Sequence, residues 1–304
     1  MAMRRQWILI CTLWVLWVPV LPAAVTPTDV FIEAKALKNG LATLVNQRAG
    51  MSLLPLIDID VTGTKPHHVY AMAIALNEKL GVYMATKQIN GFTRSGPPKA
   101  KITPGDVHAL VLIAQRNLAT MASNLTLERH QAKDKKPADV LVEIIYANLW
   151  IDQLMDGKIT PDYPFQITQM IQHELERLRQ HANINPILVN PPTYAKATPG
   201  NVFNNAENFY RLLVLSDTMR NQVSNPNHTY DIRSSGTQVK PIHVFTLSVF
   251  NLYYLTVIEH RLGLTPNLTY PELKQSLTPA DVFRQYDIIN AMLLNILANL
   301  TVAS

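Results

Sequence analysis

Thr26-Pro27-Thr28-Asp29-Val30 is the stretch that decides the fold, because variants of this phrase recur along the whole chain. The seven copies begin at Thr26, Lys65, Thr103, Lys136, Thr198, Lys240 and Thr278, and a Pro follows directly in each. The first residue alternates strictly between Thr and Lys, and the spacing is similar throughout except for one long interval after Pro137. A compact phrase that returns at a near-constant interval is typical of a repeat protein built from one supersecondary unit.

Each residue of the Thr-Pro phrase suits the start of an α-helix. The Thr hydroxyl at the N-cap accepts a hydrogen bond from a backbone N–H of the first turn. Pro at the first helical position has its φ angle preset and lacks a donor that would be unpaired there. Asp three residues after the Thr completes a capping box, and its charge suits the positive end of the helix. The phrase therefore predicts a helix start wherever it occurs.

The sequence after each phrase keeps the 3.6-residue period of a helix with one buried face. After Pro137, the apolar residues that share one face are Val140, Ile144, Ile145, Leu149 and Leu154. The longest interval between copies contains a related start at Thr160-Pro161-Asp162, and the apolar stripe that follows predicts an inserted helix over 163–183. The chain is therefore predicted to be all-α, with seven or eight helices.

The connections between the predicted helices are long and rich in Pro, Gly, Asn and Ser. The clearest examples are 50–64, 90–102, 185–197 and 225–239. Segments of this length exceed an ordinary helix–helix turn, so we expect them to run extended across the helices. The first of them is expected to bury Leu53, Leu54, Leu56 and Ile57. The predicted unit is thus a helix plus an extended return, and its length of about 38 residues lies within the range of known repeat architectures.

The alternation of Thr and Lys indicates an ancestral unit of two helices. It predicts pairs over about 26–102, 103–197 and 198–277, followed by a half-repeat cap over 278–304. These units fit either a closed bundle or a short solenoid in which each pair touches only its neighbours. The terminal half-repeat favours closure, because its helix could pack against the first helix. All of 25–304 is expected to form a single domain.

Residues 1–24 have the pattern of a secretory signal peptide. Arg4 and Arg5 form a basic start, Trp7 to Leu21 is apolar, and Pro22-Ala23-Ala24 supplies small residues for cleavage. An uncleaved N-terminal anchor is the alternative interpretation. Cys11 is the only cysteine, so a cleaved chain has no disulfide, thiolate ligand or cysteine nucleophile. An exported chain without disulfides suggests a periplasmic or secreted protein of a Gram-negative bacterium.

The composition limits the kinds of partner. The formal net charge is +5, and Arg4 and Arg5 of the signal segment contribute to it. No run of Lys and Arg with interleaved aromatic residues occurs, so we expect no nucleic-acid partner. Contact with a membrane is expected only through the signal segment, if it stays uncleaved. The expected partners are an unidentified protein or a small anionic ligand.

The three Lys-Pro helix starts are the unusual feature of the repeat. Lys65, Lys136 and Lys240 stand where the N-cap acceptor belongs, although Lys supplies no acceptor and its charge opposes the positive helix end. Two of these helices carry His68 and His243 in place of the Asp. One interpretation is an anion site, where helix N–H groups, Lys and His hold a phosphate, sulfate or carboxylate. The alternative is that the lysines are solvated and the histidines pack against a neighbouring unit.

The remaining polar residues form no catalytic or cofactor motif. The histidine spacings lack the pattern of a zinc site, so no metal and no cofactor are expected. Three pairs of carboxylates could serve acid–base hydrolysis, although solvation and capping explain them more simply. These pairs are Asp58 with Asp60, Glu143 with Asp152, and Glu174 with Glu176. The aromatic residues of the seventh helix suggest a ligand groove or, more simply, burial in the bundle; they are Phe245, Phe250, Tyr253 and Tyr254.

These observations favour an exported, non-enzymatic helical-repeat protein that binds a ligand or acts as a scaffold. The predicted ligand-binding residues are Lys65, His68, Lys136, Lys240 and His243. The first alternative is a periplasmic hydrolase whose carboxylates come from different repeats. A further alternative is a ligand-binding partner of a membrane receptor.

Overall fold

The computed structural model describes residues 24–47, 61–155, 157–192, 196–221 and 238–302. Within these ranges the chain forms eight α-helices and no strand, which confirms the all-α prediction. The helices are α1 (Pro27–Asn46), α2 (Pro66–Thr86), α3 (Pro104–Met121), α4 (Pro137–Leu154), α5 (Asp162–His181), α6 (Pro199–Asn221), α7 (Pro241–Arg261) and α8 (Pro279–Val302). The predicted signal segment up to residue 23 lies outside the described residues, as do Leu53, Leu54, Leu56, Ile57, Asp58 and Asp60.

Every described helix except α5 begins at the proline of the repeated phrase, as predicted. α5 begins at Asp162, directly after the related Pro161. The start of α3 shows the full capping exchange: the Thr103 N–H donates to Asp106 Oδ2 (2.9 Å), and the Asp106 N–H donates to Thr103 Oγ1 (3.4 Å). α1 and α6 repeat this exchange, with Asn201 as the third helical residue of α6.

The Lys-Pro helices keep only half of that exchange. No Lys side chain caps its helix, but the third helical residue still accepts a hydrogen bond from the Lys backbone N–H. In α4 the acceptor is Asp139 Oδ2, 2.8 Å from the nitrogen of Lys136. In α2 and α7 the acceptor is the Nδ1 atom of His68 or His243, at 3.1 Å in both helices. The histidines therefore replace Asp as capping acceptors.

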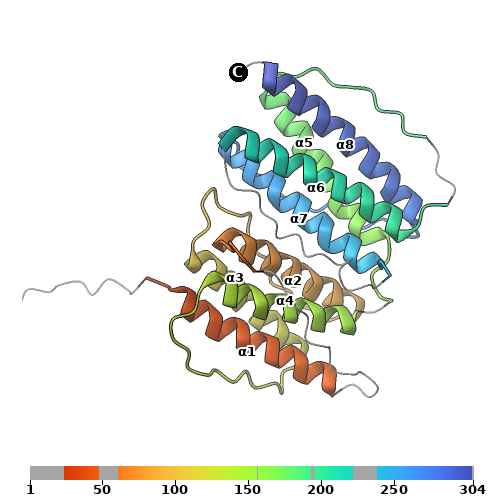
Figure 1. The fold of residues 1–304 in the computed structure, drawn as a ribbon. Helices are drawn as coiled ribbons and strands as arrows, with labels where there is room; N and C mark the ends of the chain where they lie inside the picture. The colour runs from red at the N-terminus through yellow and green to blue at the C-terminus, as the bar shows by residue number, and fades with distance from the viewer. Residues whose placement is uncertain (1–23, 48–60, 156, 193–195, 222–237, 303–304) are drawn as a thin grey trace, which may run out of the picture.

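The helices are grouped four and four (Figure 1). In the first bundle α1 packs against α3 and α4, and α2 packs against the same two helices. In the second bundle α5 packs against α7 and α8, and α6 packs against the same two helices. The helices of a consecutive pair such as α1 and α2 therefore lie diagonally across a bundle rather than side by side. The two bundles meet through α2 and α7.

The last helix does not pack against the first, so the closure that the half-repeat favoured is not observed. α8 lies far from α1 and completes the second bundle with α5 and α6 (Figure 1). The inserted helix, observed as α5, is one of the four helices of that bundle. The physical reason is that four amphipathic helices can enclose one core, whereas α6, α7 and α8 alone would leave an apolar face uncovered.

All helices of a bundle point in the same direction. The four phrases of the first bundle converge on one small apolar depression. It is lined by Pro27, Val30, Pro66, Val69, Pro104, Val107, Pro137 and Val140. In the second bundle, residues at similar depths also meet: Ser248 Oγ lies 2.7 Å from the Tyr286 hydroxyl, and Asn251 Nδ2 donates to the Ala206 carbonyl (2.9 Å). A chain that leaves a 20-residue helix such as α1 must cross about 30 Å to start a parallel neighbour, which explains the long returns.

The return between α2 and α3 shows how such a segment is held. Asn117 of α3 accepts a hydrogen bond from the Thr93 N–H (2.8 Å), and its amide donates to the Thr93 carbonyl (2.8 Å). The same amide donates to Asn77 Oδ1 of α2 at 2.7 Å. One side-chain amide thus satisfies both backbone groups of an extended residue, as a neighbouring strand would. This arrangement fits the predicted unit of a helix and an extended return.

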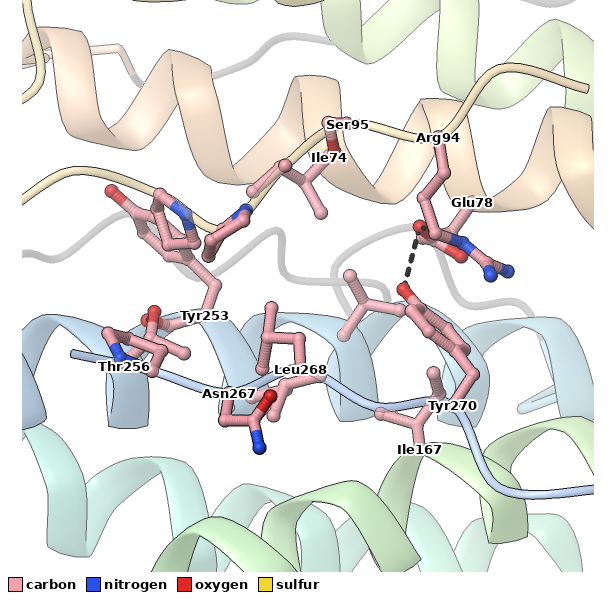
Figure 2. Close-up of a pocket in the computed structure, with 16 residues that line it drawn as sticks. Ile74, Glu78, Arg94, Ser95, Ile167, Tyr253, Thr256, Asn267, Leu268 and Tyr270 are labelled. Atoms are coloured by element: carbon pink, nitrogen blue, oxygen red, sulfur yellow. Dashed lines mark hydrogen bonds and ion pairs between the residues drawn. The ribbon is translucent and has the colours of Figure 1, made fainter.

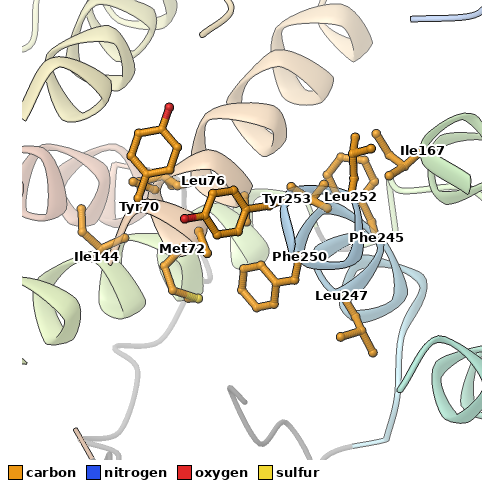
Figure 3. Close-up of a cluster of buried hydrophobic side chains, with 14 of the residues drawn as sticks. Tyr70, Met72, Leu76, Ile144, Ile167, Phe245, Leu247, Phe250, Leu252 and Tyr253 are labelled. Atoms are coloured by element: carbon orange, nitrogen blue, oxygen red, sulfur yellow. The ribbon is translucent and has the colours of Figure 1, made fainter. Parts of the chain in front are cut away.

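α2 and α7 run in opposite directions where the bundles meet. Tyr70, near the start of α2, packs against Tyr253 in the later half of α7, with 5.7 Å between ring centroids. Apolar side chains of both helices form the buried cluster around this contact (Figure 3). Phe245 and Phe250 of α7 belong to the same cluster, so burial explains most of the predicted aromatic group.

α7 is the single helix in the described part of the chain that is long and apolar enough to span a membrane. However, 72% of its most apolar window is buried inside the protein. α7 faces its own bundle on one side and α2 on the other, and a helix that is buried on all sides is expected to be apolar all round.

We expect Thr103→Ala to lower the free energy of unfolding by about 1 kcal/mol, because it removes an N-cap acceptor. Lys136→Ala, at the equivalent position of α4, should change the same quantity by less than about 0.5 kcal/mol, since this side chain makes no capping bond. Urea unfolding followed by far-UV circular dichroism measures both changes. Equal losses in the two variants would contradict the division into fully and half-capped helix starts.

Candidate functional site

A cavity of about 500 Å³ lies where the two bundles meet (Figure 2). Its walls are α2, α7, the return that follows each of these helices, and one residue of α5. The lining residues from helices are Ile74, Glu78, Ile167, Val249, Leu252, Tyr253 and Thr256; those from the returns lie within 94–98 and 266–270. Glu78, Arg94 and Tyr270 lie at one end, and Tyr253, Thr256 and Asn267 lie at the other (Figure 2). Ile74 and Leu268 lie between the two polar ends.

One end of the cavity is built around the carboxylate of Glu78. This side chain is 6% exposed, and its Oε1 accepts a hydrogen bond from the Tyr270 hydroxyl at 2.9 Å. Arg94 Nε lies 3.5 Å from the same oxygen, and the Arg94 guanidinium carbon lies 3.4 Å from the centroid of the Tyr270 ring. Burial raises the pKa of Glu78, while the charge of Arg94 and the Tyr270 hydrogen bond act in the opposite direction. This end therefore combines a buried acid, a hydroxyl donor and a guanidinium.

The other end offers neutral polar groups. Tyr253 is 2% exposed, and its hydroxyl has no hydrogen-bond partner among the described residues. Burial raises the pKa of Tyr253, so the hydroxyl keeps its proton. Thr256 Oγ1 donates to the Tyr253 carbonyl at 2.6 Å, and Asn267 adds a side-chain amide. The Tyr253 hydroxyl and the Asn267 amide can donate to a polar group of a bound molecule, and the Thr256 hydroxyl can accept from one.

A second acidic group lies behind the wall formed by Asn267. Glu174 of α5 and Glu259 of α7 are 1% and 0% exposed. Burial and the neighbouring Glu174 raise the pKa of Glu259 to about 9, while the charge of Arg177 acts in the opposite direction. Glu259 therefore keeps its proton at neutral pH. Arg177 binds Glu174 and donates to the Thr265 carbonyl (2.8 Å), and the Asn267 N–H donates to Glu174 (3.3 Å), so the pair holds this part of the return.

The residues of the predicted anion site are not brought together. Lys65 and Lys136 begin adjacent helices at the same end of the first bundle. Lys240 and His243 begin α7, and the charge of Lys79 in the later part of α2 acts on His243. Because α2 rises about 1.5 Å per residue, this place lies about 20 Å from Lys65. None of the five predicted residues lines the cavity.

The histidines at the two helix starts are placed to accept, not to donate, at Nδ1. Burial, Lys79 and Lys240 lower the pKa of His243 to about 4, so this ring is neutral at pH 7. His68 makes the same capping bond to the backbone of Lys65. A neutral histidine adds no positive charge to a helix start, and anion binding there stays a prediction.

Four of the paired carboxylates lie in the described part of the chain, and there they have partners other than those the sequence suggested; Asp58 and Asp60 lie outside it. The partners are Lys38 for Glu143 (2.7 Å), Lys79 for Asp152 (2.6 Å) and Arg179 for Glu176 (2.8 Å). Only Glu174 meets a second carboxyl group, and that group belongs to Glu259. Within the described ranges no group of three or more His, Cys, Asp or Glu residues could hold a metal ion.

The cavity was not predictable from the helical pattern, although α2 carries one signal of it. Asn77, Glu78 and Lys79 interrupt a largely apolar helix, and all three are buried. Buried polar groups are almost always hydrogen-bonded or paired, so three in succession indicate partners on several sides of the helix. The partners of Glu78 are Arg94 and Tyr270, and both come from returns, which have no periodic pattern to place them.

Comparison with known proteins gives no relative for this chain. No protein-family model, curated protein or solved structure matches it. The site is therefore interpreted from its own geometry.

We expect Glu259→Gln to stabilise the protein, increasingly so as the pH rises from about 5 to about 9. The folded-state pKa of Glu259 lies above its ordinary value of 4.5, so its contribution to stability is complete below that value and is lost as the pH rises through the folded-state pKa. Gln cannot ionise and keeps an N–H donor for Glu174. Urea unfolding at about pH 8 should show a gain on the order of 1–2 kcal/mol.

Glu176→Gln, two residues beyond Glu174 in α5, is the matched control. Its carboxylate is hydrogen-bonded by Arg179, which lowers its pKa to about 2, so the variant should give no gain at any of these pH values. An identical dependence of stability on pH in wild type and Glu259→Gln would mean that the pKa of Glu259 is not raised in the folded protein.

Proposed function

We propose that the protein binds a small molecule in the cavity between its two bundles. The observation that carries this proposal is a cavity of about 500 Å³ with an apolar middle and buried polar groups at both ends. Ligand sites are typically concave, mostly apolar, on the order of 300–1,000 Å³, and furnished with a few placed polar groups. A molecule with a compact apolar body and polar groups at its two ends suits this cavity best.

The polar groups of the cavity support a binding role because they are unfavourable for folding alone. A buried carboxylate such as Glu78 loses hydration, and the buried hydroxyl of Tyr253 has no partner among the described residues. Apolar side chains at both positions would fill the space with less loss of free energy. Polar groups that are kept beside a cavity are instead expected at sites where a ligand meets them.

The proposal includes export, on the basis of the N-terminal sequence. The basic start, apolar run and small residues before residue 25 favour delivery to the periplasm or outside the cell. A binding protein in that compartment would transfer its ligand to another protein, or would be recognised by that protein while the ligand is bound. A membrane receptor is one such partner.

A periplasmic hydrolase is the second candidate, and the pairing of Glu174 with Glu259 favours it. These carboxyl groups come from different helices, and Glu259 keeps its proton at neutral pH, as a general acid requires. Neither of them lines the cavity, however, and both are buried. Substrate could reach them only if the return at Thr265 and Asn267 moved, so we prefer the binding function.

Narrowing the cavity should weaken binding of a neutral apolar probe, the fluorescent dye N-phenyl-1-naphthylamine. Gly96 lines the cavity and is exposed, and a Cβ at this position would meet no heavy atom within 4 Å, so Gly96→Phe has room for its ring beside the bound dye. We expect the dissociation constant of the dye to rise at least about tenfold. Fluorescence titration measures it.

Gly200→Phe introduces the same side chain in the first turn of α6, outside the cavity, and serves as the control. Its affinity for the dye should equal that of the wild type. If Gly96→Phe bound the dye as tightly as Gly200→Phe and the wild type, the cavity would not be the binding site.

A further inference from the structure

Arg94 places its guanidinium against a buried carboxylate and an aromatic ring at one end of the cavity. We infer that this end is a cation site, and that the ligand carries an ammonium or guanidinium group which replaces Arg94 beside Glu78. The inference rests on the proposed binding function and names the chemical class of its ligand. Three features carry it: the geometry of the site, the long contact of Arg94 with Glu78, and the balance of charge.

The geometry is that of a cation site. The guanidinium carbon of Arg94 lies 3.4 Å from the centroid of the Tyr270 ring and 5.4 Å from that of Phe92. Its Nε lies 3.5 Å from the carboxylate of Glu78. Aromatic faces together with a desolvated carboxylate favour a positive group, and methylated or alkylated ammonium ions are commonly bound in this way.

Both aromatic rings beside Arg94 are held in place by α2 independently of Arg94, although only Tyr270 lines the cavity. The Tyr270 hydroxyl donates to Glu78 at 2.9 Å, which fixes the orientation of that ring. The Phe92 ring lies directly on Gly81, one turn after Glu78, where a Cβ would come within 2.6 Å of Phe92 Cζ. The ring can approach α2 this closely only because residue 81 is glycine. The site therefore keeps its walls when Arg94 leaves.

Arg94 is held to its carboxylate by a longer contact than Arg129 is. The nearest nitrogen of Arg94 lies 3.5 Å from Glu78, and the side chain is 43% exposed. Arg129, which is 53% exposed, places Nε 2.7 Å and 3.0 Å from the two oxygens of Glu33. A partly solvated guanidinium with a long contact to its carboxylate can return to water, because its hydration offsets the loss of that contact and of the stacking on Tyr270. Its departure opens this end of the cavity.

The balance of charge selects the class of ligand. If a neutral molecule displaced Arg94, Glu78 would stay buried without a compensating charge, which is unfavourable. An anion would add repulsion to that loss. A cation restores the pair, and its apolar body can then extend along Ile74 and Leu268 toward the neutral polar end of the cavity (Figure 2).

The opposite arrangement is that Arg94 itself binds the ligand, which would then be an anion. Three compounds with one apolar body and different head groups separate the two arrangements: octylamine, 1-octanol and octanoate. Isothermal titration at about pH 8 keeps octylamine protonated and octanoate ionised. The proteins compared are the wild type, Glu78→Gln, Arg94→Ala and, as a control for net charge, Arg116→Ala, whose side chain is exposed on α3.

We expect the wild type to bind octylamine at least about tenfold more tightly than octanol or octanoate. Glu78→Gln, which keeps an acceptor for Tyr270, should remove this preference. Arg94→Ala should tighten octylamine binding by about threefold or more, because a competitor is gone, whereas Arg116→Ala should have no effect.

Tightest binding of octanoate, lost in Arg94→Ala, would overturn the inference and make Arg94 an anion-binding residue, with the cavity still a ligand site. Equal affinities for the three compounds would overturn the charge requirement alone. If N-phenyl-1-naphthylamine and all three octyl compounds failed to bind, the proposed function would fail as well.

Discussion

The structure depends on where its helices begin. In the first bundle four starts meet at one end, so four helix dipoles point the same way and place about half a positive charge each at that end. Asp29, Asp106 and Asp139 at the third helical positions compensate much of this charge and also satisfy the backbone. The same end is sealed by apolar prolines and valines of the phrase. These carboxylates offset the repulsion between four parallel helix dipoles. The returns are long because each must cross the length of a helix before the next parallel helix can begin.

The cavity is a product of those returns. α2 and α7 are the two helices that begin with Lys-Pro-x-His, and they are also the two that join the bundles. Because they run in opposite directions, the return after one lies across from the return after the other, and the space between the bundles is walled by extended chain as well as by helices. Extended segments bring prolines, backbone groups and isolated side chains such as Arg94 and Tyr270 to the site, which a helix face could not supply in this arrangement.

The helix starts could be predicted from the sequence because capping is decided within a single turn: Thr103, Pro104 and Asp106 contain all the chemistry that begins α3. The grouping of the helices could not be predicted, because it depends on which apolar faces pack together when they are far apart along the chain, as those of α1 and α4 are. His68 and His243 were interpreted as anion ligands or as packing residues, and burial together with the charges of Lys79 and Lys240 explains why His243 is a neutral capping acceptor. The sequence shows an acidic residue, Glu78, inside an apolar helix. The positions of its partners could not be predicted, because they lie in extended segments that have no periodic pattern.

The parallel bundles also determine the order in which the chain can become compact. α1 packs against α3 and α4, not against the helix that follows it, so its apolar stripe has no complete cover until the chain has passed residue 150. The apolar stripe of α5 likewise has no complete cover until α7 and α8 have formed. Contacts so distant along the chain must overcome a large loss of loop entropy before they contribute, which makes folding slow for an all-α protein. During synthesis each bundle therefore passes through a long interval with amphipathic helices exposed, when chaperones, and any machinery that handles unfolded chains, have their best access to it.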